Sequence, residues 1–344
     1  MHRILLGLLV LPLAAQPTKL FDSAPPVVSI DVYGLHRVSA ERVLAKAGLR
    51  VGLPLPASKG DLEERIEELP QIVQARVEAA CCSDEGGVAL FVGVEERGAP
   101  YFALRSLPDG EILLDDDVVG TYRQFSSALA RAARQGFAAE DLRRGHSFSE
   151  DPEARRHQQK FQILAHAQTN HLRKVLEQSA DEEHRAIAAY VLGYVKEKRG
   201  VVNDLQRAMQ DPDPDVRGNA MRALTALAVL DAAEPEQRIR VEPTWFVEML
   251  HSVELRDRMR AVESLLVLTD ENQEKPLSLL RERGLAPLRE MALWNSLPHA
   301  VGPFTLLGRA AGQDAEAIEA AWTQGERREI VAEWVKSLEQ KKTR

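Results

Sequence analysis

Residues 211–224, DPDPDVRGNAMRAL, decide what kind of fold the second half of the chain builds. Two prolines and three aspartates stand directly before a run of residues that favours a helix. Proline ends the preceding helix and is tolerated in the first turn of the next one, where an aspartate can accept hydrogen bonds from free N–H groups. The stretch therefore predicts a helix boundary, followed by a helix whose packing face carries Ala220, Leu224 and Leu227.

The residues of this helix belong to a pattern that recurs along the chain, Arg-x-x-Ala-x-x-x-Leu. In the fourth copy Ser296 replaces the leucine. Successive copies lie 32, 41 and 31 residues apart. Alanine lets helices approach closely, leucine fills the core, and the arginine can reach an acidic group in the neighbouring repeat. Periods of this size are typical of a helical solenoid. The arginines that we predict to have this structural role are Arg185, Arg217, Arg258 and Arg289.

This pattern resembles HEAT repeats, in particular the short, aspartate-rich type. The resemblance is strongest over residues 181–231 and weaker over residues 243–309, and we expect residues 121–340 to form one helical-repeat domain. A non-repetitive helical bundle is the alternative. The resemblance implies an all-α solenoid with a long surface for other polypeptides. Such repeats also occur in lyases that attach tetrapyrroles to proteins, which leaves a lyase-like enzyme as an alternative function that rests on the repeat similarity alone.

The first part of the chain follows a different pattern. Residues 27–34, 72–81 and 88–96 alternate between apolar and polar or small side chains, which is the period of a strand. Residues 39–49 and 58–70 have the apolar spacing of amphipathic helices. The sequence therefore predicts a small β-α-α-β-β module in front of the helical repeats.

This order of elements over residues 27–97 resembles a POTRA domain, a module of bacterial envelope proteins. The resemblance implies binding of other polypeptides, commonly by addition of a strand to an exposed sheet edge. A cap that packs against the next domain is the alternative. The usual membrane-bound context of such domains is not predicted by the rest of the sequence, so a transport function is not carried over. Residues 98–120 predict a linker with a small hairpin around Pro108–Gly110.

The N-terminus predicts export. Residues 1–15, MHRILLGLLVLPLAA, combine a basic start, an apolar core and small residues near a cleavage site at Ala15, as in a secretory signal peptide. A buried strand or a short anchor is the alternative, and the apolar core is too short to span a membrane. We expect a periplasmic or secreted protein. Its adjacent cysteines, Cys81 and Cys82, are poorly placed for a disulfide with one another.

Composition and motifs narrow the function further. A net charge of −8, a pI near 5.7 and 5% aromatic residues argue against a nucleic-acid partner. The histidine spacing matches no metal-binding pattern, and no nucleophile elbow, phosphate loop or dinucleotide fingerprint occurs. GHSFSED (residues 145–151) contains a histidine and two serines, but it is typical of a loop. We therefore expect no catalytic residue, no cofactor and no metal.

One apolar stretch, PTWFVEML at residues 243–250, offers a candidate partner contact. Trp245, Phe246 and Met249 crowd one short helix, where they serve either as core or as an anchor for a partner. The sequence as a whole favours an exported, non-enzymatic scaffold that binds envelope proteins through its repeats, with a sheet edge as a second contact. A purely structural periplasmic protein without a client is a further alternative.

Overall fold

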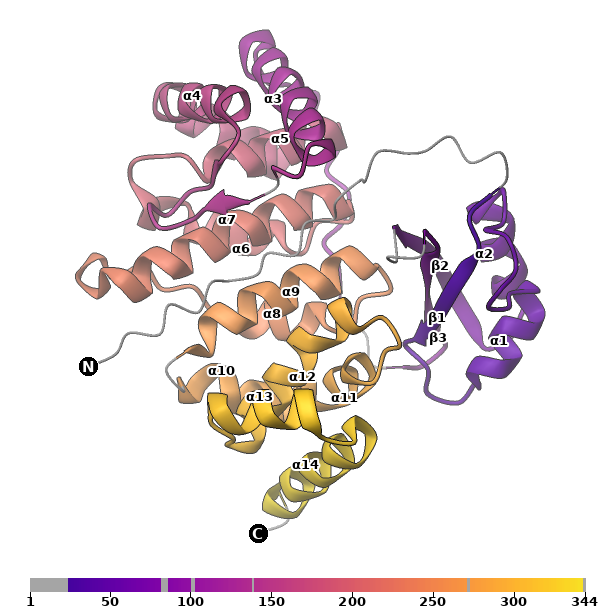
Figure 1. The fold of residues 1–344 in the computed structure, drawn as a ribbon. Helices are drawn as coiled ribbons and strands as arrows, with labels where there is room; N and C mark the ends of the chain where they lie inside the picture. The colour runs from indigo at the N-terminus through magenta and orange to yellow at the C-terminus, as the bar shows by residue number, and fades with distance from the viewer. Residues whose placement is uncertain (1–23, 82–85, 100–102, 138, 271–272, 343–344) are drawn as a thin grey trace.

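The chain forms a small sheet module beside a larger stack of helices (Figure 1). The predicted signal peptide and Cys82 lie outside the described residues. Within the part of the chain that is described, no helix has both the length and the apolar composition needed to cross a bilayer. The structure is a computed structural model, and it describes residues 24–81, 86–99, 103–137, 139–270 and 273–342.

The N-terminal module has the predicted order of elements, so the β-α-α-β-β prediction is confirmed. Its elements are β1 (Val27–Tyr33), α1 (Ala40–Ala47), α2 (Lys59–Glu67), β2 (Ile72–Cys81) and β3 (Val88–Glu96). β3 is the central strand, because it pairs in parallel with β1 and antiparallel with β2. β1 and β2 are therefore the two edges of the sheet.

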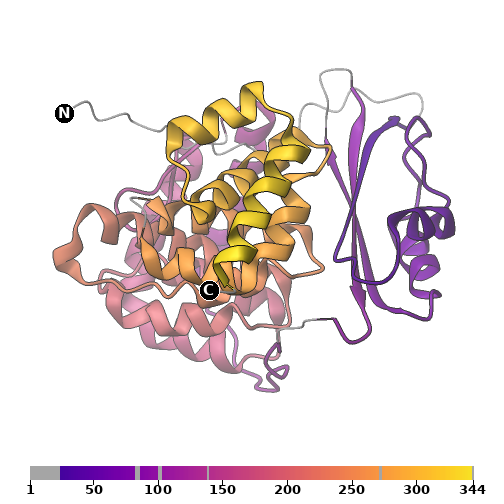
Figure 2. The same ribbon diagram turned by 90° about the horizontal axis from the view of Figure 1, so that it is seen from below.

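The alternation of side chains along β3 gives the sheet two different faces. Leu90 packs with Ile66 of α2 in the module's own core, whereas the next residue, Phe91, is buried against the helical repeats. Ser39 and Ser58 cap α1 and α2 by accepting hydrogen bonds from backbone N–H groups in the first turn. Figure 2 shows α1 and α2 on the side of the sheet that is remote from the repeats.

The described chain after the module is mainly helical, which confirms the predicted all-α part. Its first helix begins at Asp116, five residues before the predicted start of the domain. A two-stranded ribbon of β4 (Glu140–Asp141) and β5 (Phe148–Ser149) interrupts the helices. The helices are α3 (Asp116–Arg134), α4 (Pro152–Gln178), α5 (Glu182–Leu192), α6 (Val202–Ala208), α7 (Pro214–Ala233), α8 (Thr244–Met249), α9 (Leu255–Leu268), α10 (Glu274–Leu279), α11 (Leu285–Ala292), α12 (Leu297–Ala311), α13 (Ala315–Gln324) and α14 (Arg327–Lys342).

Helices α5 to α12 form two rows, as in a solenoid. In the first row α5 packs on α7, α7 on α9, and α9 on α12. In the second row, α6 and α8 each pack on the first-row helix that follows in the chain. α10 continues through a π-helical turn, Leu280–Gly284, into α11, so α11 belongs to the second row and packs on α12. α12 therefore takes the first-row position after α9.

The helix boundary predicted at residues 211–224 is present. Asp213 is the N-cap of α7, and its side chain accepts hydrogen bonds from the N–H groups of Asp215 and Val216, both at 3.0 Å. Ala220 and Leu224 are completely buried, as their spacing predicts. The prolines and aspartates thus end one repeat and start the next.

Candidate functional site

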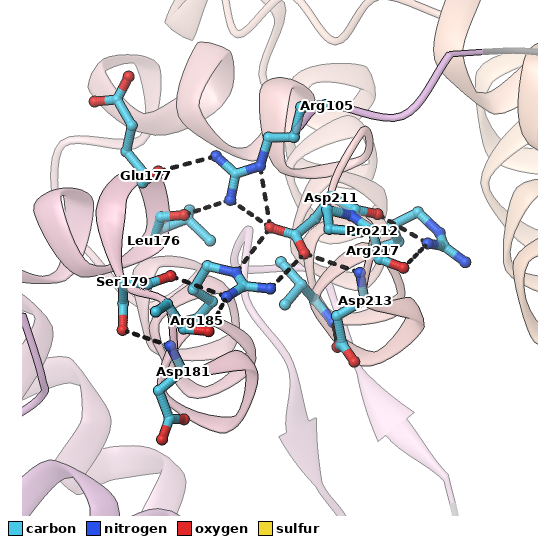
Figure 3. Close-up of polar contacts among 12 residues, drawn as sticks. Arg105, Leu176, Glu177, Ser179, Asp181, Arg185, Asp211, Pro212, Asp213 and Arg217 are labelled. Atoms are coloured by element: carbon cyan, nitrogen blue, oxygen red, sulfur yellow. Dashed lines mark hydrogen bonds and ion pairs between the residues drawn. The ribbon is translucent and has the colours of Figure 1, made fainter. Parts of the chain in front are cut away.

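Three buried arginines, each in the first turns of a first-row helix, connect the loops that lead into these helices; we name Arg185, Arg217 and Arg258 the arginine ladder. Arg185 of α5 is its first member (Figure 3). Its Nε and Nη2 atoms donate to the two carboxylate oxygens of Asp211, each at 3.0 Å. Its Nη1 atom donates to the carbonyl oxygens of Ser179 and Ala180, in the loop before α5. Arg185 therefore joins its own loop to the loop of the next repeat.

Arg217 of α7 repeats this arrangement one repeat later. Its Nε and Nη2 atoms donate to Oδ2 of Asp257, at 2.9 and 2.7 Å, and its Nη1 atom donates to the carbonyl oxygens of Asp211 and Pro212. Ser252 also donates to Asp257. Burial raises the pKa of Asp257, and the neighbouring Arg217 acts in the opposite direction.

The third rung, Arg258 of α9, connects the ladder to the sheet module. Its Nε atom donates to the carbonyl oxygen of Ser252, and its Nη1 atom donates to Glu290 of α11 at 3.2 Å. Glu290 also accepts the N–H of Gly34, at 3.0 and 3.1 Å to its two oxygens. The guanidinium of Arg258 lies 4.4 Å from the ring centre of Tyr33, a cation–π contact.

The prediction that Arg289 forms a fourth rung is wrong. In α5, α7 and α9 the ladder arginine stands four residues after the N-cap, and in α12 this position is Ala300. Arg289 lies instead on the second-row helix α11, where its side chain is exposed. The sequence pattern matched a second-row helix here, because α11 contains an Arg-x-x-Ala run of its own, from Arg289 to Ala292. The residue beside it, Glu290, is the one that takes part in the ladder.

The fourth loop, residues 293–296 between α11 and α12, receives its acidic group from the sheet module. Asp31 of β1 is buried, and it accepts hydrogen bonds from the N–H groups of Asn295 and Ser296, at 2.7 and 3.1 Å, and from the amide of Asn295. The hydroxyl of Tyr33 donates to the carbonyl oxygen of Val253, in the third loop, which connects α8 to α9. The module is thus docked on the loops where the ladder ends.

Aromatic packing closes the same interface. Phe91 meets Trp294 edge-to-face with ring centres 5.1 Å apart, and Tyr33 lies 5.5 Å from Trp294. Beside these rings, the backbone of Gly93 in β3 lies very close to the backbone of Val253. A Cβ atom on Gly93 would lie 2.3 Å from the carbonyl oxygen of Val253. The sheet face opposite α1 and α2 is therefore used for contact within the chain.

Residues 103–115, which we name the strap, run along the loops before α7 and α5. The hairpin predicted around Pro108–Gly110 is not formed. Gly110 instead exchanges hydrogen bonds with the α4–α5 loop, donating to Gln178 O at 2.9 Å and accepting from Ala180 N at 2.7 Å. Nearer the end of the strap, the N–H of Leu114 donates to His184 at 2.8 Å. The segment is thus held along the repeats.

Arg105 fixes the strap to the ladder (Figure 3). Its guanidinium donates to Oδ2 of Asp211 and to the carbonyl oxygens of Leu176 and Glu177, at the C-terminal end of α4. Its own N–H donates to the carbonyl oxygen of Gln210 at 2.7 Å. The carboxylate of Asp211 therefore serves two arginines, one from the repeats and one from the strap. No sequence motif marks Arg105, which is why the sequence did not single it out.

Two cavities lie between the module and the repeats, and together they form what we name the interdomain cleft. The first, of about 600 Å³, is lined by β1 and α11, and the second, of about 530 Å³, by β2, the strap and the loops before α7 and α9. Both are lined by Glu95 and His251. Each volume lies in the range of ligand pockets in proteins.

The edges of the sheet are partly occupied within the chain. The outward N–H groups of Ala75 and Val77 on β2 donate to carboxylates of α2, those of Glu67 and Glu63, at 2.9 and 2.7 Å. On β1, the carbonyl oxygen of Ile30 accepts from the amide of Asn295. Addition of a strand to the middle of β2 would require both carboxylates of α2 to move away.

The candidate partner residues of the 243–250 stretch lie mainly in the interior. Phe246 and Met249 are completely buried, so neither side chain is available to a partner in this conformation. Trp245 is half-buried and packs against the same core. The apolar spacing within this six-residue helix serves the packing of α8 between its neighbours.

In the GHSFSED segment, which contains β5, His146 forms a buried pair with Lys198 from the segment between α5 and α6. His146 Nδ1 lies 3.3 Å from Nζ of Lys198, which donates to the carbonyl oxygen of Gly193 at 2.8 Å. Burial lowers the pKa of Lys198 to about 7, and burial together with Lys198 lowers the pKa of His146 to about 4. The cavity that His146 lines has a volume of about 10 Å³, room for about one water molecule.

Comparison with known proteins agrees with the repeat architecture. No curated protein and no solved structure matches the chain. The family match does not extend to the N-terminal module, whose similarity to a POTRA domain stays a prediction. Residues 169–265, which include the three rungs of the arginine ladder, match the family model for HEAT repeats.

Proposed function

We propose that this protein is an exported, non-enzymatic scaffold that binds other polypeptides of the bacterial envelope. The interdomain cleft is the single observation that carries the proposal. It lies between a HEAT-like solenoid and a sheet module, and HEAT repeats suggest a role in protein–protein interaction. The signal-peptide pattern of residues 1–15 and the POTRA-like order of the module support export to the envelope.

The way in which the cleft is built supports binding without a large rearrangement. Its walls are fixed by buried or half-buried contacts, such as Asp31 on the fourth loop and Arg105 on Asp211. A preformed site loses little conformational entropy when it is filled, and this favours affinity. The repeats carry the proposal more strongly than the sheet edges, because the outward N–H groups in the middle of β2 already have partners.

Site-specific photo-crosslinking tests the proposal. A photoreactive amino acid is placed at Ala286, an exposed residue that lines the cleft, and in a second variant at Ile163, which is 71% exposed on α4. Both variants are expressed in the native host with an intact N-terminus. We expect crosslinked envelope polypeptides from Ala286 and none from Ile163. Equal crosslinking at the two positions, or retention of the protein in the cytoplasmic fraction, would contradict the proposal.

A further inference from the structure

Glu95 lies where the two cavities of the cleft meet. It stands near the end of β3, and its backbone pairs with Gln74 of β2. The alternation along β3 puts its side chain on the same face as Phe91 and Gly93, the face that is docked on the repeats. The side chain is half-buried, and it lines both cavities.

The other acidic groups that line the cleft are already satisfied within the protein. Glu254 pairs with Arg76, and Glu290 pairs with Arg258. Glu96 accepts hydrogen bonds from three backbone N–H groups, those of residues 36–38. Asp31 accepts three hydrogen bonds from the fourth loop, as described above.

Among the described residues, Glu95 has neither a hydrogen bond nor an ion pair on its carboxylate. Burial raises the pKa of the Glu95 carboxyl. His251, which lines both cavities with it, donates its Nε2–H to the carbonyl oxygen of Arg283 at 2.9 Å. Burial lowers the pKa of His251, so its ring does not supply a positive charge to the cleft near pH 7. Four arginines also line the two cavities, but none of them forms an ion pair with Glu95; they are Arg76, Arg217, Arg258 and Arg289.

The surroundings of Glu95 are suited to an apolar chain. In the second cavity, Val73 is 49% exposed, and Leu104, Pro212 and Pro214 are half-buried. The first cavity is lined by apolar side chains of β1, α1, α11 and the residue that follows α11, namely Ile30, Val32, Leu44, Ala286 and Leu293. A ligand that fills both cavities would therefore place apolar groups on either side of the carboxylate.

We propose that Glu95 anchors a lysine or arginine side chain of a polypeptide segment that lies in the interdomain cleft with apolar residues on both sides of the basic one. This inference rests on the proposed function and names the chemistry of the partner. A charge-assisted hydrogen bond to a partly buried carboxylate is stronger than one between neutral groups. A cation from the partner would supply the ion pair that Glu95 makes with none of the described residues.

Peptide binding tests the proposal. The probes are fluorescein-labelled nine-residue peptides with alternating valine and serine flanks and one central residue, either arginine, its neutral isostere citrulline, or glutamate. Binding to the purified protein is followed by fluorescence anisotropy at low ionic strength. We expect the arginine peptide to bind about tenfold more tightly than the citrulline peptide, and the glutamate peptide most weakly. In Glu95→Gln the arginine and citrulline peptides should bind equally.

Glu64→Gln is the matched control, because Glu64 is an exposed carboxylate on α2 outside the cleft. It should keep the preference for arginine. If Glu95→Gln keeps that preference as well, the anchor is wrong, while binding of all three peptides would leave the scaffold proposal intact. If none of the peptides binds, the anchor is overturned, and the crosslinking at Ala286 then decides the scaffold proposal separately. If spermidine competes as well as the unlabelled arginine peptide, the site takes small cations, and the assignment to a polypeptide is overturned.

Discussion

The guanidinium of Arg185 and the carboxylate of Asp211 form two parallel hydrogen bonds, and both side chains are completely buried. Removal of two charges from water costs free energy, which excellent geometry and further hydrogen bonds offset. Here Arg185 also reaches two carbonyl oxygens, and Asp211 accepts from Arg105 and from the N–H of Asp213. The pair therefore holds two repeats and the strap together at one point.

Asp211→Asn should destabilise the protein strongly. The substitution keeps the shape of the side chain but leaves Arg185 buried without a counter-charge, and loss of one partner of a buried pair costs about 3–5 kcal/mol. The free energy of unfolding, measured by urea denaturation, should fall by this amount. Asp215→Asn is the control, since Asp215 pairs with Arg256 on the surface, where such pairs contribute about 1 kcal/mol or less. Equal losses in the two variants would contradict a structural role for the buried pair.

Much of the fold could be predicted from local patterns. Strand alternation and helix spacing predicted the order of elements in the module, and the proline–aspartate stretch predicted the helix boundary that the structure places before Pro214. The pattern also indicated that the ladder arginines reach acidic groups of a neighbouring repeat. Arg185, Arg217 and Arg258 do so, because their repeats keep the same spacing between cap and arginine.

The docking of the module could not be predicted in this way. Gly34 and Glu290 are 256 residues apart, and Tyr33 and Val253 are 220 residues apart, so no local period records these contacts. Phe91 appeared as an ordinary strand residue, although its face packs on the repeats. Glu95 carries no motif either, and only the shape of the cleft makes it a candidate.

Arg105→Ala should loosen the strap without unfolding the repeats. The variant loses the hydrogen bonds to Leu176, Glu177 and Asp211, but Asp211 keeps Arg185 as its counter-charge. Hydrogen exchange read by mass spectrometry should show the N–H group of Gly110 exchanging about tenfold faster, which corresponds to about 1.4 kcal/mol of lost local stability.

Arg123→Ala serves as the control for the strap, because Arg123 pairs with Glu183 on the surface. It should leave exchange in the strap unchanged. Exchange at Gly110 that is the same in Arg105→Ala and in the parent protein would mean that the backbone contacts of the strap hold it without the arginine.

Gly93→Ala should weaken the docking of the module. The added Cβ atom would meet the carbonyl oxygen of Val253 at 2.3 Å, so the sheet or the loop has to shift. Hydrogen exchange at Asn295 and Ser296, whose N–H groups are bonded to Asp31, should become faster, while the module keeps its own core. Gly60→Ala is the control, because a Cβ atom there meets nothing within 4 Å. Unchanged exchange at both N–H groups in Gly93→Ala would show that the interface tolerates the shift.

We predict that Lys198 makes the free energy of unfolding depend on pH, and the sign of this dependence follows from the lowered pKa of Lys198. The folded protein releases this proton at a pH of about 7, whereas the unfolded chain keeps it up to the ordinary lysine pKa of 10.5. Between these values the unfolded state binds the additional proton, so a rise in pH favours the folded state. The contribution of Lys198 to the free energy of unfolding should therefore increase by up to about 1.4 kcal/mol per pH unit in this window.

Lys198→Met isolates this contribution, because it removes the titrating amine and keeps most of the buried side-chain volume. Urea denaturation from pH 7 to pH 10 should show the parent protein gaining stability relative to the variant as pH rises. Below pH 7 both states of the parent carry the proton, and the difference from the variant should become constant. Lys196→Met, which removes an exposed amine from the same segment, should follow the parent protein throughout. A difference between Lys198→Met and the parent that stays flat from pH 7 to pH 10 would mean that the buried amine keeps its proton, and that His146 and Gly193 hold it as a cation.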